Sequence, residues 1–129
     1  MILPCLVVTA SGKEKGGRGV YTTKNIKAGT VIEISPVLVF TRTERKVIEE
    51  TKLHHYIFEW GKSTKLAALG MGYVSMYNHD YNANCDYDMD YENELITITV
   101  VKDVKKGAEL FINYNASPDS QKPVWFDAK

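Results

Sequence analysis

Short apolar segments alternate with polar, glycine-rich segments through the first forty residues. Leu6 to Thr9 is apolar and β-branched, whereas Ser11 to Gly19 is polar and too rich in glycine to hold a helix. Extended character returns over Val20 to Thr23 and again over Thr30 to Phe40, where valine and isoleucine dominate. We therefore predict strands over about residues 5–40.

The pattern changes between Arg45 and Trp60. Apolar residues there recur at spacings of three and four, namely Leu53, Tyr56, Ile57 and Trp60. This is the period of an amphipathic helix, so we predict one helix over this stretch. A further helical turn is expected at Lys65 to Leu69, before Gly70 and Gly72 stop it. The helical insert then covers about residues 43–70.

Alternation is cleanest from Cys85 to Val101, which predicts a β-hairpin with its turn at Glu92 and Asn93. One face of the first strand carries Cys85, Tyr87, Met89 and Tyr91, and the other carries Asp86, Asp88 and Asp90. Two interpretations of this carboxylate row stay open. It is either a solvated face that discourages edge pairing or a docking surface for a lysine- or arginine-rich peptide.

Length and charge narrow the class of protein. A chain of 129 residues suits one domain, and its 16 basic and 16 acidic residues cancel. We therefore expect no direct binding to nucleic acid and no attraction to an anionic membrane. No apolar run approaches a membrane span, and Met1 to Pro4 lacks the features of a signal peptide. A soluble intracellular protein is expected, cytoplasmic if its source is bacterial.

Cysteine usage gives no metal or disulfide signal. Cys5 and Cys85 stand far apart, without a Cys-x-x-Cys pair, and read as buried or half-buried thiols. A metal-dependent hydrolase built from His79, Cys85 and the hairpin aspartates is a further alternative. Alternation disfavours it, because those aspartates point away from Cys85. We predict no metal site.

Two short segments carry the densest candidate chemistry. Tyr77 to Cys85 is rich in groups that donate and accept hydrogen bonds, and Glu109 to Tyr114 is a strand that ends on a tyrosine. A third segment is the glycine-rich Gly17 to Tyr21, which is followed by Ile26 to Glu33. This Gly-x-Gly is not a dinucleotide fingerprint, since the third glycine and its helix are missing.

In this order and spacing, the three segments resemble the SET-domain protein lysine methyltransferases. The resemblance rests on Gly17 to Tyr21 with residues 26–33, on Asn78-His79 with Asn84-Cys85, and on Lys106 to Tyr114. It runs from about Val7 to Phe126. The segments Tyr56 to Trp60 and Gly72 to Tyr77 look most like the small free-standing members found in bacteria and large DNA viruses.

The resemblance implies a mainly β fold of the SET, or β-clip, type. Its short strands and hairpins would carry one helical insert, and a C-terminal tail would thread near the active site. A single SET domain would span residues 1–129. Residues 71–115 would form the cofactor and catalytic half, and residues 116–129 the tail.

The implied activity is methyl transfer from S-adenosylmethionine to the ε-amine of a lysine in a protein or peptide. Tyr114 matches the catalytic tyrosine. Tyr87, which we also count as catalytic, matches a tyrosine of the lysine channel that limits how many methyl groups fit in some members of the family. The cofactor residues implied are Arg18, Gly19, Tyr77, Asn78, His79, Trp125 and Phe126. Tyr73, Tyr87 and Trp125 would line the substrate channel, and Trp125 and Phe126 would fold over cofactor and channel.

Three positions depart from the family pattern. Asp80 replaces the usual serine after Asn-His, Ala83 replaces a proline, and Asn113 replaces the common aspartate before the catalytic tyrosine. Asp80 and Ala83 support an alternative, a catalytically weak SET-like domain that binds a basic peptide or the cofactor without turnover. The substrate would be a lysine-containing protein, with basic sequences among the options, and a homodimer stays open.

Overall fold

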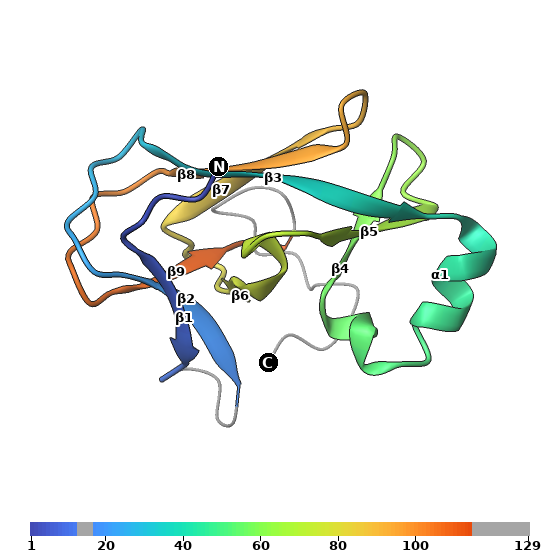
Figure 1. Cartoon of the computed structure of the whole chain (residues 1–129), viewed down its shortest axis with the longest axis horizontal. Coiled ribbons are helices and arrows are strands. Elements are labelled where there is room, and N and C mark those ends of the chain that lie inside the picture. Colours follow the sequence, from blue (N-terminus) through green and yellow to red (C-terminus); the bar gives the residue numbers. More distant parts are fainter. Residues whose placement is uncertain (13–16, 115–129) are drawn as a thin grey trace.

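Curled β-sheets dominate the computed structural model, which describes residues 1–12 and 17–114 (Figure 1). One sheet has the strand order β1-β2-β9-β6, and the other has the order β4-β5-β3-β8-β7. The first is built from β1 (Leu6–Ala10), β2 (Arg18–Thr22), β6 (Asn78–His79) and β9 (Glu109–Ile112). The second comprises β3 (Val31–Phe40), β4 (Ile57–Trp60), β5 (Leu66–Gly70), β7 (Cys85–Asp90) and β8 (Leu95–Val100).

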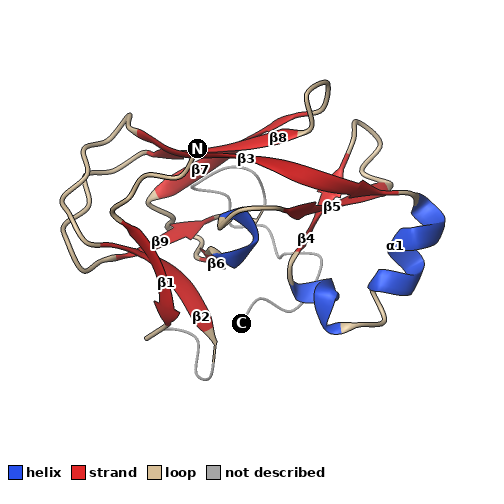
Figure 2. Cartoon of the chain, viewed as in Figure 1, coloured by secondary structure: helices blue, strands red, loops and turns tan. Residues whose placement is uncertain are grey.

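Helical structure is short by comparison, as Figure 2 shows. The described part of the chain has α1 (Arg42–Ile48) and the 3₁₀ turns η1 (Lys52–His55) and η2 (Val74–Met76). None of these is long and apolar enough to cross a bilayer. The expectation of a mainly β fold is confirmed.

Strand β3 joins the two ends of the five-stranded sheet. Its residues from Val31 to Pro36 pair with β8, and those from Val37 to Phe40 pair with β5. The register shifts between Val31 and Glu33, so alternation is broken and both Ile32 and Glu33 are fully buried. A carboxylate thereby enters the core.

The prediction of one helix up to Trp60 is wrong, because α1 ends at Ile48. The side chain of Thr41 accepts the N–H of Glu44 in a capping box that starts α1, and the Thr51 side chain caps η1. Ile57–Trp60 then forms a strand that pairs with Leu66–Gly70, where a helical turn was expected. Aromatic and β-branched residues suit a strand once β5 offers a neighbour, and four residues cannot distinguish the two periods.

The predicted hairpin is confirmed in position and facing. Cys85 pairs with Val100 and Asp90 with Leu95, while Cys85 and Tyr87 are buried and Asp88 is exposed. Burial raises the pKa of the Cys85 thiol to about 12. Cys5 is half-buried, so both thiols lie where the sequence placed them.

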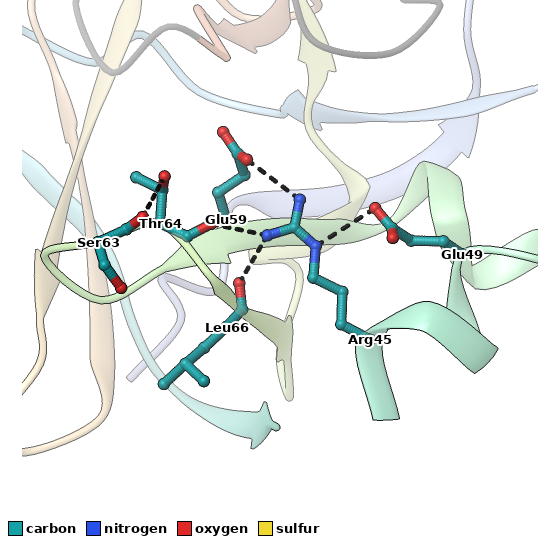
Figure 3. A network of polar contacts seen from close by, with 6 residues as sticks. All are labelled: Arg45, Glu49, Glu59, Ser63, Thr64 and Leu66. Carbon is teal, nitrogen blue, oxygen red and sulfur yellow. Dashed lines mark hydrogen bonds and ion pairs between the residues drawn. The ribbon is translucent and has the colours of Figure 1, made fainter. Parts of the chain in front are cut away.

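Arg45 fastens α1 to the β4–β5 hairpin of the insert (Figure 3). Its guanidinium donates to the carbonyls of Thr64 and Leu66 at 2.7 and 3.1 Å. It also pairs with Glu49 at 3.3 Å and Glu59 at 3.1 Å. The side chain is only 13% exposed, which lowers its screening by solvent. The insert is therefore tied together by one planar cation with several donors.

Replacing Arg45 with lysine should lower the free energy of unfolding by about 1–2 kcal/mol, because one ammonium cannot reach four acceptors on three elements. Urea denaturation measures this change. The control is Glu49→Gln, which removes only the i,i+4 pair and should cost less than about 0.5 kcal/mol. Equal losses in the two variants would contradict the proposed role of Arg45.

Candidate functional site

The Asn-His segment lies beside the end of the chain's last strand. Strands β6 and β9 pair in parallel, with Asn78 opposite Phe111 and His79 opposite Ile112 (Figure 1). The N–H of Asp80 extends the pairing by donating to the carbonyl of Ile112 at 3.1 Å. Two segments more than thirty residues apart in sequence thus lie side by side, and Tyr114 comes two residues after the end of β9.

Tyr114 is held at its backbone and at its hydroxyl. Its N–H donates to Nδ1 of His79 at 3.1 Å, and its hydroxyl donates to the carbonyl of Tyr77 at 2.8 Å. The rings of Tyr114 and His79 lie 5.0 Å apart. Because Nδ1 accepts a hydrogen bond, neutral His79 carries its proton on Nε2. The Tyr114 ring therefore has one defined direction.

Tyr87 is the second tyrosine of this site. Its hydroxyl donates to the carbonyl of Tyr114 at 3.0 Å, so β7 is linked to the chain just after β9. Its ring packs 5.5 Å from that of Phe58, which comes from β4. The sequence did not indicate Phe58, since the helix predicted there gave it no fixed relation to the hairpin. The insert reaches the site through this residue.

A buried carboxylate supports the segment before Asn78. Glu33 is fully buried and accepts hydrogen bonds from the Ser35 hydroxyl at 2.7 Å, the Tyr73 N–H at 2.7 Å and the Tyr77 hydroxyl at 2.9 Å. A side chain at Gly72 would place its Cβ 2.6 Å from this carboxylate, so glycine is required there. Glu33 thus joins β3 to the η2–β6 segment.

Burial raises the pKa of the Tyr77 hydroxyl well above its ordinary value of 10.0, and the Glu33 charge raises it further. Tyr77 therefore stays a neutral donor to Glu33. The sequence missed Glu33 because simple alternation along β3 does not place Ile32 and Glu33 in the core together. A glutamate in an otherwise apolar strand was the available signal.

A second carboxylate joins Asn78 to the glycine-rich strand. Nδ2 of Asn78 donates to Oε2 of Glu109 at 2.8 Å and to the carbonyl of Arg18 at 3.0 Å. A Cβ at Gly19 would lie 2.2 Å from Glu109 Oε2, so the carboxylate packs directly on this glycine. The predicted cofactor residues Arg18, Gly19 and Asn78 do come together, around a glutamate given no role beforehand.

The loop after His79 is held by its own side chains. Asp80 accepts the N–H of Asn82 at 2.8 Å, an Asx turn, and Ala83 is fully buried. Asn84 donates to the carbonyl of Glu109 at 3.0 Å and accepts the N–H of Phe111 at 2.8 Å. The loop is therefore restrained by the hydrogen bonds of Asp80 and Asn84 and by the burial of Ala83.

The remaining predicted residues are less central. Tyr73 gives its backbone N–H to Glu33, and its half-buried ring packs against the core. Trp125 and Phe126 lie outside the described residues. Asn113 is buried, 3.5 Å from the carbonyl of Tyr81 through its Nδ2.

The outward carboxylates of β7 are partly engaged by the hairpin itself. Asp90 accepts from the side chain and backbone of Asn93, and the side-chain bond lowers its pKa. Burial raises the pKa of Asp86, which accepts the N–H of Tyr87. Across residues 1–12 and 17–114, no three histidine, cysteine or acidic side chains are grouped to hold a metal ion. The hairpin aspartates and Cys85 lie on opposite faces, against the hydrolase alternative.

Comparison with known families agrees with this geometry. The SET domain family matches residues 17–115, a range that holds β2, β6, β9 and Tyr114. The chain belongs to the SET-domain family of lysine methyltransferases. A Schizosaccharomyces pombe relative, the histone-lysine N-methyltransferase specific for H3 lysine-37, is 38% identical over 115 residues. The match covers 88% of this SET chain and 73% of the relative.

Solved structures share the SET fold. A Plasmodium falciparum histone methyltransferase candidate superposes with a TM-score of 0.67 at 23% identity, covering 90% of this chain and 97% of that one. The Polycomb Repressive Complex 2 of Chaetomium thermophilum, autoinhibited and bound to S-adenosylmethionine, gives a TM-score of 0.71 at 24% identity. That match covers 85% of this chain and 15% of the other. At these identities the likeness concerns the fold alone.

Replacing Tyr77 with phenylalanine should lower the free energy of unfolding by about 1–3 kcal/mol at neutral pH, because Glu33 loses one of three donors in a buried site. This loss should shrink from about pH 10 upward. The unfolded chain releases the Tyr77 proton near pH 10 and the folded chain only above it, so the hydroxyl stabilises less as pH rises. Urea denaturation between pH 8 and 11 tests both statements.

Cys85 titrates in both proteins and cancels from the comparison. The exposed Tyr91→Phe is the matched control and should change neither quantity. If the difference between wild type and Tyr77→Phe stays constant to pH 11, the hydroxyl is not held neutral in the folded protein.

Proposed function

We propose that this chain transfers a methyl group from S-adenosylmethionine to the ε-amine of a lysine in a protein. The observation that carries the proposal is Tyr114, whose backbone and hydroxyl are both fixed beside the Asn78-His79 pair. Membership in the SET family and the Schizosaccharomyces pombe relative support the same chemistry.

The polar groups around β6 fit a cationic cofactor. S-adenosylmethionine carries a sulfonium and an α-ammonium group, and it supplies the electrophilic methyl when bound. Both hydrogens of the Asn78 amide point to Glu109 and Arg18, so Oδ1 faces the other way as an acceptor. Oδ1 of Asn78, whose amide is hydrogen-bonded to the Glu109 carboxylate, suits the binding of an ammonium group. The backbone at Arg18, Gly19 and His79 and the neighbouring Tyr77 complete the cofactor residues we assign.

Tyr114 would orient the lysine amine. Its hydroxyl donates to the Tyr77 carbonyl, which fixes the position of the phenol oxygen, and a phenol oxygen can accept an N–H from the substrate amine. Displacement at a methyl group requires donor and acceptor in line, and a fixed acceptor near the amine restricts its approach. Tyr87 would form the adjoining channel wall, because its own hydroxyl is bonded to the Tyr114 carbonyl.

The reacting lysine must be neutral. Deprotonating an ordinary lysine at pH 7 costs about 4.6 kcal/mol. Aromatic rings that exclude water lower this cost by disfavouring the ammonium form. Tyr87 and Phe58 supply two such rings, and we assign Tyr73, Trp125 and Phe126 to the same enclosure from the family resemblance.

The substrate class follows from the same comparison. The relative's name gives histone H3 lysine-37 as its target, so histone H3 is the first protein to test. A lysine-rich protein mixture is the second. The β7 carboxylates Asp86, Asp88 and Asp90 lie on the outer face of the hairpin and would favour a basic segment around the target lysine.

Replacing Tyr114 with phenylalanine should reduce methyl transfer by at least about 100-fold, since the amine loses its oriented acceptor. The dissociation constant for S-adenosylmethionine should change less than about threefold. Transfer of radiolabelled methyl to recombinant histone H3 measures the first quantity, and isothermal titration measures the second. Tyr91→Phe, an exposed tyrosine of the hairpin, serves as the control.

Full transfer by Tyr114→Phe would contradict the mechanism. Tight cofactor binding by the wild type without transfer to histone H3 or to the lysine-rich mixture would instead favour the alternative, a domain that binds without turnover. Absence of cofactor binding would contradict the proposed function as a whole.

A further inference from the structure

Glu109 lies where three segments of the chain meet. Its Oε1 accepts from the Ser11 hydroxyl at 2.7 Å and from the Tyr21 hydroxyl at 3.0 Å, and its Oε2 accepts from Asn78 at 2.8 Å. Tyr21 in turn accepts the N–H of Gly12 at 3.0 Å. One carboxylate on β9 therefore joins the end of β1, strand β2 and strand β6.

The carboxylate also decides which way the Asn78 amide faces. An ionised carboxylate and a backbone carbonyl only accept hydrogen bonds, so Nδ2 of Asn78 must point to Glu109 and Arg18. A planar amide then directs Oδ1 to the opposite side. Without Glu109, only the Arg18 carbonyl still favours this orientation, so the amide would be held less firmly and could turn a donor toward the cofactor, which would repel an ammonium group.

Glu109 also packs closely on the glycine-rich strand β2. The carboxylate lies against Gly19, where any Cβ would come within 2.2 Å of Oε2 and 2.9 Å of Asn78 Nδ2. Strand β9 itself is paired on both sides, with β2 through Leu110 and Val20 and with β6 through Phe111 and Asn78, and Leu110 is fully buried. Glu109 therefore lies between paired strands and contacts both the Gly19 position and the Asn78 side chain.

We propose that Glu109 is a positioning residue for the cofactor site, which sets the Asn78 amide as an acceptor for the ammonium group of S-adenosylmethionine. This inference rests on the proposed function. Glu109 acts through Asn78 and does not touch the reacting atoms, so it governs affinity for the cofactor more than the rate of the bound complex.

A double-mutant cycle on the full chain tests this role. By isothermal titration, Glu109→Ala should raise the dissociation constant for S-adenosylmethionine by about tenfold, and so should Asn78→Ala. The double variant should be no more than about twofold weaker than Asn78→Ala, because the second change removes a partner that is already gone. Independent, multiplying losses would overturn the proposal.

Glu109→Gln separates positioning from a general structural role. Its amide oxygen can still accept from Asn78, and its NH₂ can donate to the Ser11 and Tyr21 hydroxyls, whose protons rotate freely. It should restore the cofactor affinity to within about threefold of wild type. At saturating cofactor, kcat on histone H3 should stay within about threefold in both Glu109 variants. A loss in kcat with unchanged cofactor affinity would overturn the proposal.

A control variant and a substitute for Glu109→Ala distinguish failure of the proposed function from failure of the role of Glu109. Glu92→Ala, an exposed carboxylate in the β7–β8 turn, should leave cofactor affinity unchanged. If Glu109→Ala does not fold, the cycle is run with Ser11→Ala combined with Tyr21→Phe, which should weaken cofactor binding less than Asn78→Ala does. If wild type binds no cofactor, the proposed function fails; if it binds and the cycle is additive, only the role of Glu109 fails.

Discussion

The site depends on a two-residue parallel pairing between β6 and β9. Two residue pairs alone stabilise a pairing of strands only weakly, so the β6–β9 pairing needs other contacts to hold it. Asn84 supplies two side-chain bonds to the β9 backbone, and the buried Leu110 and Ile112 anchor β9 in the core. Because this pairing is fixed, Tyr114, which follows β9, lies beside His79 and within hydrogen-bonding distance of the Tyr77 carbonyl.

Three consecutive side chains then connect this pairing to β3, to β9 and to the chain just after β9. Tyr77 reaches Glu33 on β3, Asn78 reaches Glu109 on β9, and His79 receives the N–H of Tyr114. A carboxylate removed from water is costly unless it is hydrogen-bonded, and the buried Glu33 and the half-buried Glu109 each accept three bonds from side chains or backbone. The polar groups of this region therefore specify one arrangement of Tyr77, Asn78 and His79.

The parts of the fold and of the candidate site that depend on local sequence patterns could be predicted from the sequence. Period-two alternation identified the β7–β8 hairpin and the side of Tyr87, and motif order gave Tyr114 and Asn78-His79. The β4 strand was not predictable, since Ile57, Phe58 and Trp60 fit both periods and only pairing with β5 decides between them. The roles of Glu33 and Glu109 depend on a bulge and on contacts between distant segments, which local patterns do not contain.

Hydrogen–deuterium exchange with and without S-adenosylmethionine tests the central claim, that β2, β6 and the end of β9 form one cofactor site. Binding should slow exchange together in residues 17–21, 77–81 and 109–114, while α1, which lies apart from these strands in Figure 1, keeps its rate. Protection confined to the insert, or to one of the three segments alone, would contradict the account.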